Sequence, residues 1–296
     1  MKVRRYREDD APAVATISAT CAHTESDFAL NPLWETEAEL AIEFARFGID
    51  PCSHLLVADA GDGEVLGFAG FLRQPGSPDA GLVCPVVVRG GRRRGVGGDL
   101  LRAVLKHGRD SLGIRLATAG IGTRNRAGYS LLASHGFRPV RQHFFMRCDS
   151  RPVSVPPSNA EALTFENASA ADTAAILEIY HACGFPRRDA ETMEAFFGDG
   201  RHAHAVARDG GRIIAFVELE THWQRRSWVA YVGVDEAHRD RGIGSALVAW
   251  AIARRLEAGA DSAMLLLSPA NRTALRAYEK VGFRRSRLID VLEKSL

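Results

Sequence analysis

Residues 239–244 read Arg239-Asp240-Arg241-Gly242-Ile243-Gly244 and stand between two apolar segments. The segment before them, 229–234, predicts a buried strand, and the segment after them, 245–250, predicts a helix. The stretch is therefore a short glycine-containing loop that leads from a strand into a helix. Because the N–H groups at a helix N-terminus are unpaired and the helix dipole favours negative charge there, the loop is suited to hold a pyrophosphate.

The same arrangement occurs a second time, earlier in the chain. Residues 92–97 read Arg92-Arg93-Arg94-Gly95-Val96-Gly97 and follow the apolar run 82–88. Asn125 precedes Gly136-Phe137 by the same spacing that separates Asn271 from Gly282-Phe283. Such self-similarity is typical of a duplicated unit. A proline- and serine-rich stretch between the copies is typical of a linker. We therefore predict tandem domains at 1–149 and 161–296, joined by a linker at 150–160.

Each copy has the same predicted order of elements. A strand and one or two helices come first, then several antiparallel strands, the glycine loop, and an alternation of helix and strand. Asp209-Gly210-Gly211 predicts a tight hairpin between two of the antiparallel strands. The fold class is therefore mixed α/β, with a mostly antiparallel central sheet flanked by helices.

Composition limits the function further. The chain has 296 residues, which is long for one core, with 46% hydrophobic and 25% charged residues as in ordinary globular proteins. A net charge of +2 gives no overall attraction to nucleic acid or membrane surfaces. The five cysteines are scattered without metal-ligand spacing, and no apolar run is long enough for a membrane span. We expect a cytoplasmic monomer or homodimer with no metal, no nucleic acid and no membrane partner.

The second copy resembles the GCN5-related N-acetyltransferase (GNAT) superfamily over most of 161–296. The residues that carry the resemblance are Val232-Gly233-Val234, then Arg239-x-x-Gly242-x-Gly244, then Asn271-x-x-Ala274-x-x-x-Tyr278-x-Lys280-x-Gly282-Phe283. Other glycine loops do not match, because no Lys-Ser/Thr pair follows as in a P-loop and the third glycine of a dinucleotide fingerprint is absent.

The resemblance implies an acetyl-CoA site. The pyrophosphate would bind the backbone amides of Arg239, Asp240, Arg241, Gly242, Ile243, Gly244 and Ser245, with the Arg239 side chain adding charge. The strand that contains Val232 and Val234 would separate from its neighbour, so that its amides pair with the pantetheine arm and polarise the thioester carbonyl. Asn271 would contact the CoA arm, and Tyr278 would protonate the departing thiolate.

The first copy keeps the matching positions Val87, Arg92, Gly95 and Gly97 as candidates for acyl-CoA binding, but it departs from the pattern. Leu132 stands where the second copy has Tyr278. Pro85 lies in the strand before the loop, and one residue fewer is expected between that strand and Arg92. This asymmetry resembles tandem GNAT proteins such as mycothiol synthase, where one copy is catalytic and the other is largely structural. We therefore expect catalysis in the second copy only.

The general base is open between two glutamates. Glu218, Glu220 and His222 alternate along a predicted strand and would share one face, where a raised pKa would help a glutamate to take the amine proton. Alternatively, the glutamates are solvated and pair with Arg225 or Arg226. In mycothiol synthases the proposed base is a glutamate early in the strand before the loop, and residues 226–231 hold no carboxylate here.

The expected activity is transfer of an acetyl group from acetyl-CoA to a primary amine of a small molecule, by direct attack in a ternary complex. One alternative acceptor is a protein lysine or N-terminal amine. A second alternative is a non-catalytic acyl-CoA-binding module. A third, an acyl-enzyme on Cys84, has no histidine at a recognisable partner spacing to support it.

Overall fold

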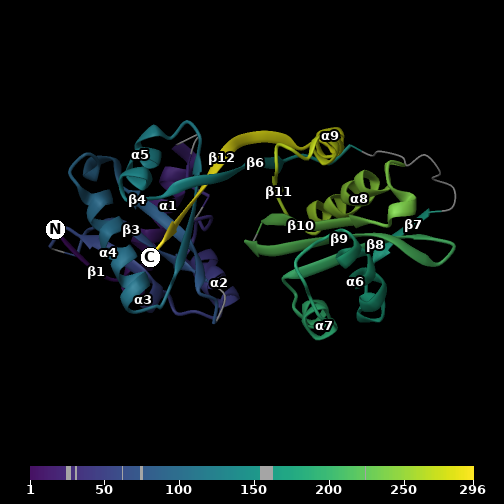
Figure 1. The fold of residues 1–296 in the computed structure, drawn as a ribbon, viewed down its shortest axis with the longest axis horizontal. Coiled ribbons are helices and arrows are strands. Elements are labelled where there is room, and N and C mark those ends of the chain that lie inside the picture. The colour runs from purple at the N-terminus through teal and green to yellow at the C-terminus, as the bar shows by residue number, and fades with distance from the viewer. Residues whose placement is uncertain (25–27, 31, 62, 74–75, 154–162, 224) are drawn as a thin grey trace. The chain divides into compact units, whose positions relative to one another are not determined.

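A computed structural model of the chain describes residues 1–24, 28–30, 32–61, 63–73, 76–153, 163–223 and 225–296, without the side chains of residues 23, 24, 222 and 223. The chain forms two compact units (Figure 1). The first unit holds Met1–His143 and Arg287–Leu296, and the second holds Phe144–Ser286. Within the described part of the chain, no helix has both the length and the apolar character needed to cross a bilayer.

The first unit is a sheet in the order β1-β2-β3-β4-β5-β12 with helices on both faces. Apolar side chains of α1 and α2 pack on one face, and those of α4 and α5 pack on the other. Its strands are β1 (Lys2–Arg5), β2 (Leu55–Asp59), β3 (Val65–Leu72), β4 (Asp79–Val87), β5 (Leu116–Gly122) and part of β12 (Arg284–Ser295). Its helices are α1 (Ala11–Thr24), α2 (Glu37–Arg46), α3 (Pro51–His54), α4 (Val96–Asp110) and α5 (Arg126–Ser134).

The second unit repeats this plan with the sheet order β6-β11-β10-β9-β8-β7. Helices α6 and α7 cover one face, and α8 and α9 cover the other. Its strands are part of β6 (Arg138–Cys148), β7 (Leu163–Asn167), β8 (His202–Asp209), β9 (Arg212–Trp223), β10 (Arg226–Val234) and β11 (Ser262–Leu267). Its helices are α6 (Thr173–Ala182), α7 (Ala190–Gly198), α8 (Ile243–Glu257) and α9 (Arg272–Val281). In both units most strand pairs are antiparallel, which confirms the predicted mixed α/β class.

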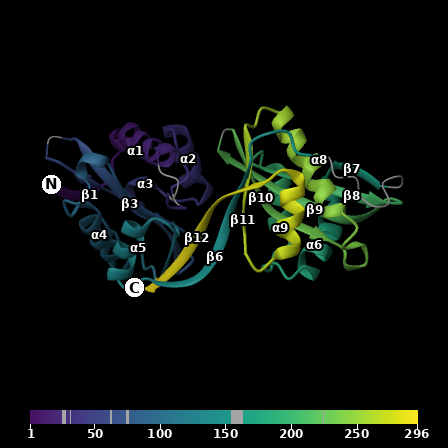
Figure 2. The ribbon, with the colours of Figure 1, turned by 90° about the horizontal axis from the view of Figure 1, so that it is seen from above.

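The two units exchange strands. The last residues of β6 belong to the second unit, where Phe144–Cys148 pairs with β11. The end of β12 belongs to the first unit, where Ile289–Ser295 pairs with β5. Figure 2 shows the C-terminal end of β12 within the first unit. Each sheet is therefore completed by a strand that the other repeat supplies. The units are discontinuous in sequence, and they differ in this from the continuous domains 1–149 and 161–296 expected above.

Two local expectations can be compared with the structure. Asp209 pairs with Arg212, and the two residues between them, Gly210 and Gly211, have φ of 55° and 88°, as the predicted hairpin requires. Most of the predicted linker 150–160 lies outside the described residues. Within its described part, the Val153 N–H donates to the Val281 carbonyl at 2.9 Å, so the chain leaves along the end of α9.

Candidate functional site

The strand that leads into the predicted pyrophosphate loop separates from its neighbour in the second unit. β10 pairs with β11 in parallel only where Arg226–Trp228 faces Ser262–Met264. Beyond Trp228, β10 continues to Val234 paired with β9, with a shift of register between Val229 and Tyr231. The edge of β10 that faces β11, from Val229 to Val234, therefore lines an opening in the sheet.

The first unit has the same separation. β4 pairs with β5 only where Asp79–Gly81 faces Leu116–Thr118. Pro85 lies in an irregular part of β4, next to Cys84, where the register against β3 shifts. A bulge is a position at which a strand tolerates proline, because no ladder hydrogen bond is required there. Burial raises the pKa of the Cys84 thiol to about 12, which keeps it protonated and gives no support to an acyl-enzyme.

Both loops adopt the same unusual backbone. Asp240 has φ of 62° and Arg93 has φ of 60°, and these two are the non-glycine residues with positive φ in the part of the chain that is described. Two residues later, Gly242 and Gly95 cap helices α8 and α4 in the left-handed conformation, with φ of 79° and 87°. Successive left-handed and helical residues turn backbone N–H groups toward one concave surface, which is an arrangement that binds anions. The loop sequence therefore fixes a preformed cradle in each unit.

The loop arginines anchor these cradles to the strands. Arg239 Nε donates to the Val234 carbonyl at 3.1 Å, and Arg92 Nε donates to the Val87 carbonyl at 2.9 Å. A second guanidinium nitrogen of each arginine donates to a cysteine sulfur: Arg239 to Cys183 and Arg92 to Cys21. The two loops are thus built alike, and the expectation of a missing residue between the first strand and Arg92 is wrong. Both arginines hold the loop on the end of the strand.

Asn271 is the N-cap of α9. Its side-chain oxygen accepts from the Ala274 N–H at 3.0 Å, and Asn125 caps α5 in the same way through the Gly128 N–H at 2.9 Å. The repeated asparagines therefore have a structural role in both units. That role leaves the Asn271 amide nitrogen as the group that would contact a CoA arm.

The two asparagines provide a matched test of these roles. We expect Asn271→Ala and Asn125→Ala each to lower the free energy of unfolding by about 1 kcal/mol, because each removes an N-cap hydrogen bond. Only Asn271→Ala should also raise the KM for acetyl-CoA. Urea denaturation and steady-state kinetics measure the two effects separately. Unchanged stability in both variants would contradict the capping role.

Tyr278 lies on α9 and is half-buried. Its ring packs edge-on against Phe283, with 5.4 Å between the ring centroids. It belongs to the same apolar cluster as Val232 and Val234 of the separated part of β10. Burial raises the pKa of the Tyr278 phenol to about 12, so it carries its proton at any ordinary pH. In the first unit the matching Leu132 is fully buried and offers no proton donor.

Glu218 is fully buried on the face of the sheet that α6 and α7 cover, where it belongs to an ion-paired group. Arg188 Nη1 lies 2.5 Å from Glu218 Oε2, and His204 Nε2 lies 3.4 Å from the same oxygen. His202 Nδ1 lies 3.9 Å from the other carboxylate oxygen. Tyr180, Phe196 and Tyr231 surround the Arg188 guanidinium, with their ring centroids 4.7 to 5.3 Å from its central carbon.

Glu218 lacks the raised pKa that would help a glutamate to act as the base. Burial alone would raise the pKa of this carboxyl, but the close approach of His204 and the hydrogen bonds from Arg188, together with the charges of both, outweigh burial and hold the pKa below its usual value. A carboxylate stabilised in this way is a weak proton acceptor. Glu220 lies two residues along the same strand and is half-buried, whereas the His222 side chain lies outside the described residues.

His202, Glu218 and Glu220 also have the donor types of a metal site. One ligand atom from each lies within 4.8 Å of the others. A cation bound there would have to compete with the Arg188 guanidinium for Glu218. The geometry therefore fits an internal ion pair better than a resident metal.

A pocket of about 760 Å³ opens beside this group. It is lined by His181, Phe185, Arg187, Arg188 and Asp189, between α6 and the start of α7. Phe185 packs on Tyr231 with 4.9 Å between ring centroids, and Tyr231 lies on the separated part of β10. Through the Tyr231 ring, the pocket therefore adjoins the strand whose edge toward β11 lines the opening in the sheet.

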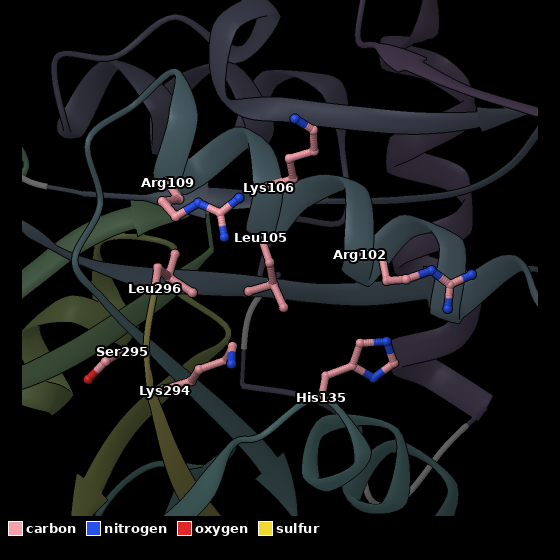
Figure 3. Close-up of a pocket in the computed structure, with 8 residues that line it drawn as sticks. All are labelled: Arg102, Leu105, Lys106, Arg109, His135, Lys294, Ser295 and Leu296. Carbon is pink, nitrogen blue, oxygen red and sulfur yellow. The ribbon is translucent and has the colours of Figure 1, made fainter.

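A second pocket, of about 420 Å³, lies in the first unit. Figure 3 shows its basic side chains, which come from α4, from His135 at the end of α5 and from the end of β12. Lys106 and Arg109 are paired with Asp110 in this region. The lining residues of α4 run from its middle to its C-terminal end, away from the Arg92–Gly97 loop at its N-terminus. This basic pocket is therefore distinct from the cradle of the first unit.

The sequence pattern did not reveal Arg188, His202 or His204. His202 and His204 alternate on β8 and face Glu220 and Glu218 across the strand pair. That alternation is a usable signal only once the register of the two strands is known. Arg188 carries no such signal, because it lies in an irregular segment between two helices.

Comparison with known proteins agrees with this geometry. Residues 19–137 and 173–283 each match the family described as acetyltransferase (GNAT) family. A mycothiol acetyltransferase of Thermobispora bispora is 30% identical in an alignment that covers 96% of this chain and 97% of the relative. An N-alpha-acetyltransferase 30 of Xenopus laevis is 34% identical over 77 residues, which are 26% of this chain and 28% of the relative.

Solved structures show the same fold. A GCN5-related N-acetyltransferase from Sphaerobacter thermophilus aligns with a TM-score of 0.81 and 22% identity, and the alignment covers 99% of this chain and 95% of that one. A tandem GNAT protein from the clavulanic acid biosynthesis pathway aligns with a TM-score of 0.73 and 16% identity over 99% and 98% of the two chains. With family matches in both halves and a 30% identical relative along nearly its whole length, the chain belongs to the acetyltransferase (GNAT) family, whose enzymes take their acetyl group from acetyl-CoA.

Proposed function

We propose that the second unit transfers the acetyl group of acetyl-CoA to a primary amine of a small molecule, by direct attack in a ternary complex. The observation that carries this proposal is the combination, in one unit, of the opened edge of β10, the left-handed loop at α8 and Tyr278. The first unit has the loop and the separation but has Leu132 in place of the phenol.

Acetyl-CoA would bind along the opened edge of β10. The N–H groups of Ile243, Gly244 and Ser245 in the first turn of α8 would take the pyrophosphate, because they have no partner within the helix. The edge from Val229 to Val234 would pair with the amides of the pantetheine arm. One amide of that edge would also donate to the thioester oxygen, where negative charge develops in the transition state.

The transfer needs one bond to form and one to break. The amine nitrogen attacks the thioester carbon, and the tetrahedral intermediate collapses with loss of the C–S bond. Tyr278 gives its proton to the departing thiolate and regains one from solvent. The attacking nitrogen loses a proton through water, and we propose Glu220 as the acceptor because Glu218 is fully buried and ion-paired.

The pocket beside Phe185 and Arg188 is the proposed acceptor site. It adjoins Tyr231 and carries polar groups from Arg187 and Asp189 among its lining residues. Its volume of about 760 Å³ suits a small polar molecule. A second candidate acceptor is a peptide N-terminal amine, which the local likeness to N-alpha-acetyltransferase 30 favours.

An acceptor panel tests the proposal. The chain would be incubated with acetyl-CoA and each of several amines: deacetylated mycothiol, amino sugars, polyamines, a lysine peptide and a peptide with a free N-terminus. Release of CoA and a product 42 Da heavier than the amine are expected for a small molecule. Product with the peptides alone would replace the small-molecule proposal by the second candidate. Absence of product with every amine would count against both.

The two capping glycines distinguish the units in the same assay. We expect Gly242→Ala to raise the KM for acetyl-CoA about tenfold, because a left-handed alanine costs roughly 1–2 kcal/mol and the loop must keep that shape to bind. Gly95→Ala introduces the same strain in the first unit and is the matched control. Its KM should equal that of the unaltered chain. A larger effect from Gly95→Ala would assign binding to the first unit.

A further inference from the structure

The opening in the sheet of the first unit is filled by the chain itself. Ala29 forms an antiparallel bridge with Ile121 of β5, and the Leu30 N–H donates to the Gly120 carbonyl at 2.9 Å. The other edge of β5 is taken by β12, through pairs that include Gly120 with Val291. The bridge must therefore lie on the edge of β5 that faces β4, inside the opening.

The side chains show that this segment lies within the sheet, as a strand would. Phe28 is buried among the side chains of the α1 and α2 face, whereas Ala29 is buried among those of the α4 and α5 face. Arg287 Nη2 donates to the Ala29 carbonyl at 3.4 Å and holds the segment from β12. A Cβ on Gly120 would lie 2.6 Å from the Leu30 Cβ, so only glycine allows this close approach.

Burial of the neighbouring strand differs between the units in the way a filled opening requires. In the first unit, every residue of β5 from Ala119 to Gly122 is buried. At the matching positions 265–268 of the second unit, Leu265 is also buried, but Leu266 and Leu267 are half-exposed and Ser268 is exposed. The opening beside β11 is therefore accessible, and the opening beside β5 is closed.

We infer that residues 28–30 are a plug that occupies, in the first unit, the place a pantetheine arm would take, so that this unit holds its own backbone in place of acyl-CoA. The inference rests on the proposed function in treating the opening as the pantetheine site. A peptide is a chemically close substitute, because the pantetheine arm itself consists of amide groups and short carbon chains. The chain accordingly binds one acetyl-CoA, and the Arg92–Gly97 loop maintains the fold of the first unit.

Titration calorimetry with acetyl-CoA tests the plug directly. Phe28→Ala with Leu30→Pro removes the apolar anchor and the N–H that bonds to Gly120. Leu30→Ala keeps that N–H and is the matched control. We expect the unaltered chain and Leu30→Ala each to bind one equivalent of acetyl-CoA. The double variant Phe28→Ala with Leu30→Pro, called the released variant below, should bind two equivalents.

Any other number of bound acetyl-CoA molecules would contradict the plug, the proposed function or both. Two equivalents in the unaltered chain would overturn the plug, and one equivalent in the released variant would show that residues 28–30 are not what excludes the ligand. No binding by the unaltered chain, with one equivalent in the released variant, would uphold the plug and remove the proposed function. No binding by either would overturn both.

A measurement on the unaltered chain avoids any folding defect of the variants. We expect the Leu30 amide to exchange slowly with deuterated solvent without ligand, and residues 28–30 and 119–122 to show no change with acetyl-CoA. Rapid exchange at Leu30, or a ligand-dependent change in either segment, would overturn the plug.

Discussion

Replacing Tyr278 by phenylalanine should lower kcat for acetyl transfer about 100-fold and leave the Kd for acetyl-CoA unchanged. The substitution removes one hydroxyl from a half-buried ring and keeps its packing against Phe283. General acid catalysis contributes on the order of 10² to 10⁴ in rate, and the thiolate would then depend on water for its proton. Because the pKa of Tyr278 is about 12, the loss should be similar at every pH at which the enzyme works.

The first unit supplies the control for this variant. Tyr129 is a half-buried tyrosine one turn before Leu132 on the matching helix α5, so Tyr129→Phe makes the same chemical change in the unit without the proposed site. Stopped-flow or steady-state CoA release and a direct acetyl-CoA titration would be measured for both variants. Equal kcat in Tyr278→Phe and the unaltered chain would remove the phenol from the mechanism.

Replacing Glu218 by glutamine should lower the free energy of unfolding by about 3–5 kcal/mol. The side chain of Glu218 is fully buried and that of Arg188 is 12% exposed, so the substitution leaves a desolvated guanidinium without its carboxylate. Urea unfolding measures the loss. The exposed pair of Arg225 with Asp261 is the control, because Asp261→Asn breaks a solvent-screened contact and should cost less than about 1 kcal/mol.

A double variant distinguishes an unpaired charge from poor packing. Glu218→Met with Arg188→Met removes both charges and should be more stable than Glu218→Gln, because no buried ion is left without a partner. If the double variant were the less stable of the two, lost packing around Arg188 would be the larger effect.

The same group gives the chain an acid-sensitive contribution to stability. The pKa of Glu218 is lower in the folded chain than its ordinary value of 4.5, so the folded state favours the ionised form. This contribution is complete above pH 4.5 and is lost as the pH falls through the folded-state pKa. The stability difference between the unaltered chain and Glu218→Gln should therefore shrink as the pH drops below 4.5. A difference that stays constant down to pH 3 would contradict the lowered pKa.

Local sequence predicted the parts of the site that depend on local geometry. The glycine loop was predicted at Gly242, where the structure has a left-handed glycine at the start of α8. Asn271 was expected only to contact the CoA arm, although its role as N-cap of α9 also depends on neighbouring residues. The separation of β10 followed from the family resemblance. These features depend on a few consecutive residues, so a short motif is enough to specify them.

The rest depends on contacts between residues far apart in sequence. Arg188 meets Glu218 only because the segment between α6 and α7 folds over β9, and His204 reaches it from the neighbouring strand; these contacts give Glu218 a lowered pKa. The exchange of β6 and β12 depends on which sheet edge each strand finds, which the strand sequences do not encode. Residues 28–30 read as an irregular stretch until their pairing with β5 is known.

Hydrogen exchange across the whole chain, measured with and without saturating acetyl-CoA, is the most direct test of where the acetyl donor binds. The central claim is that the second unit holds the acetyl donor. We predict slower exchange in peptides that cover 229–234 and 239–245, and unchanged exchange in peptides that cover 82–88 and 92–97. Slower exchange in the first-unit peptides with none in 229–245 would contradict the account.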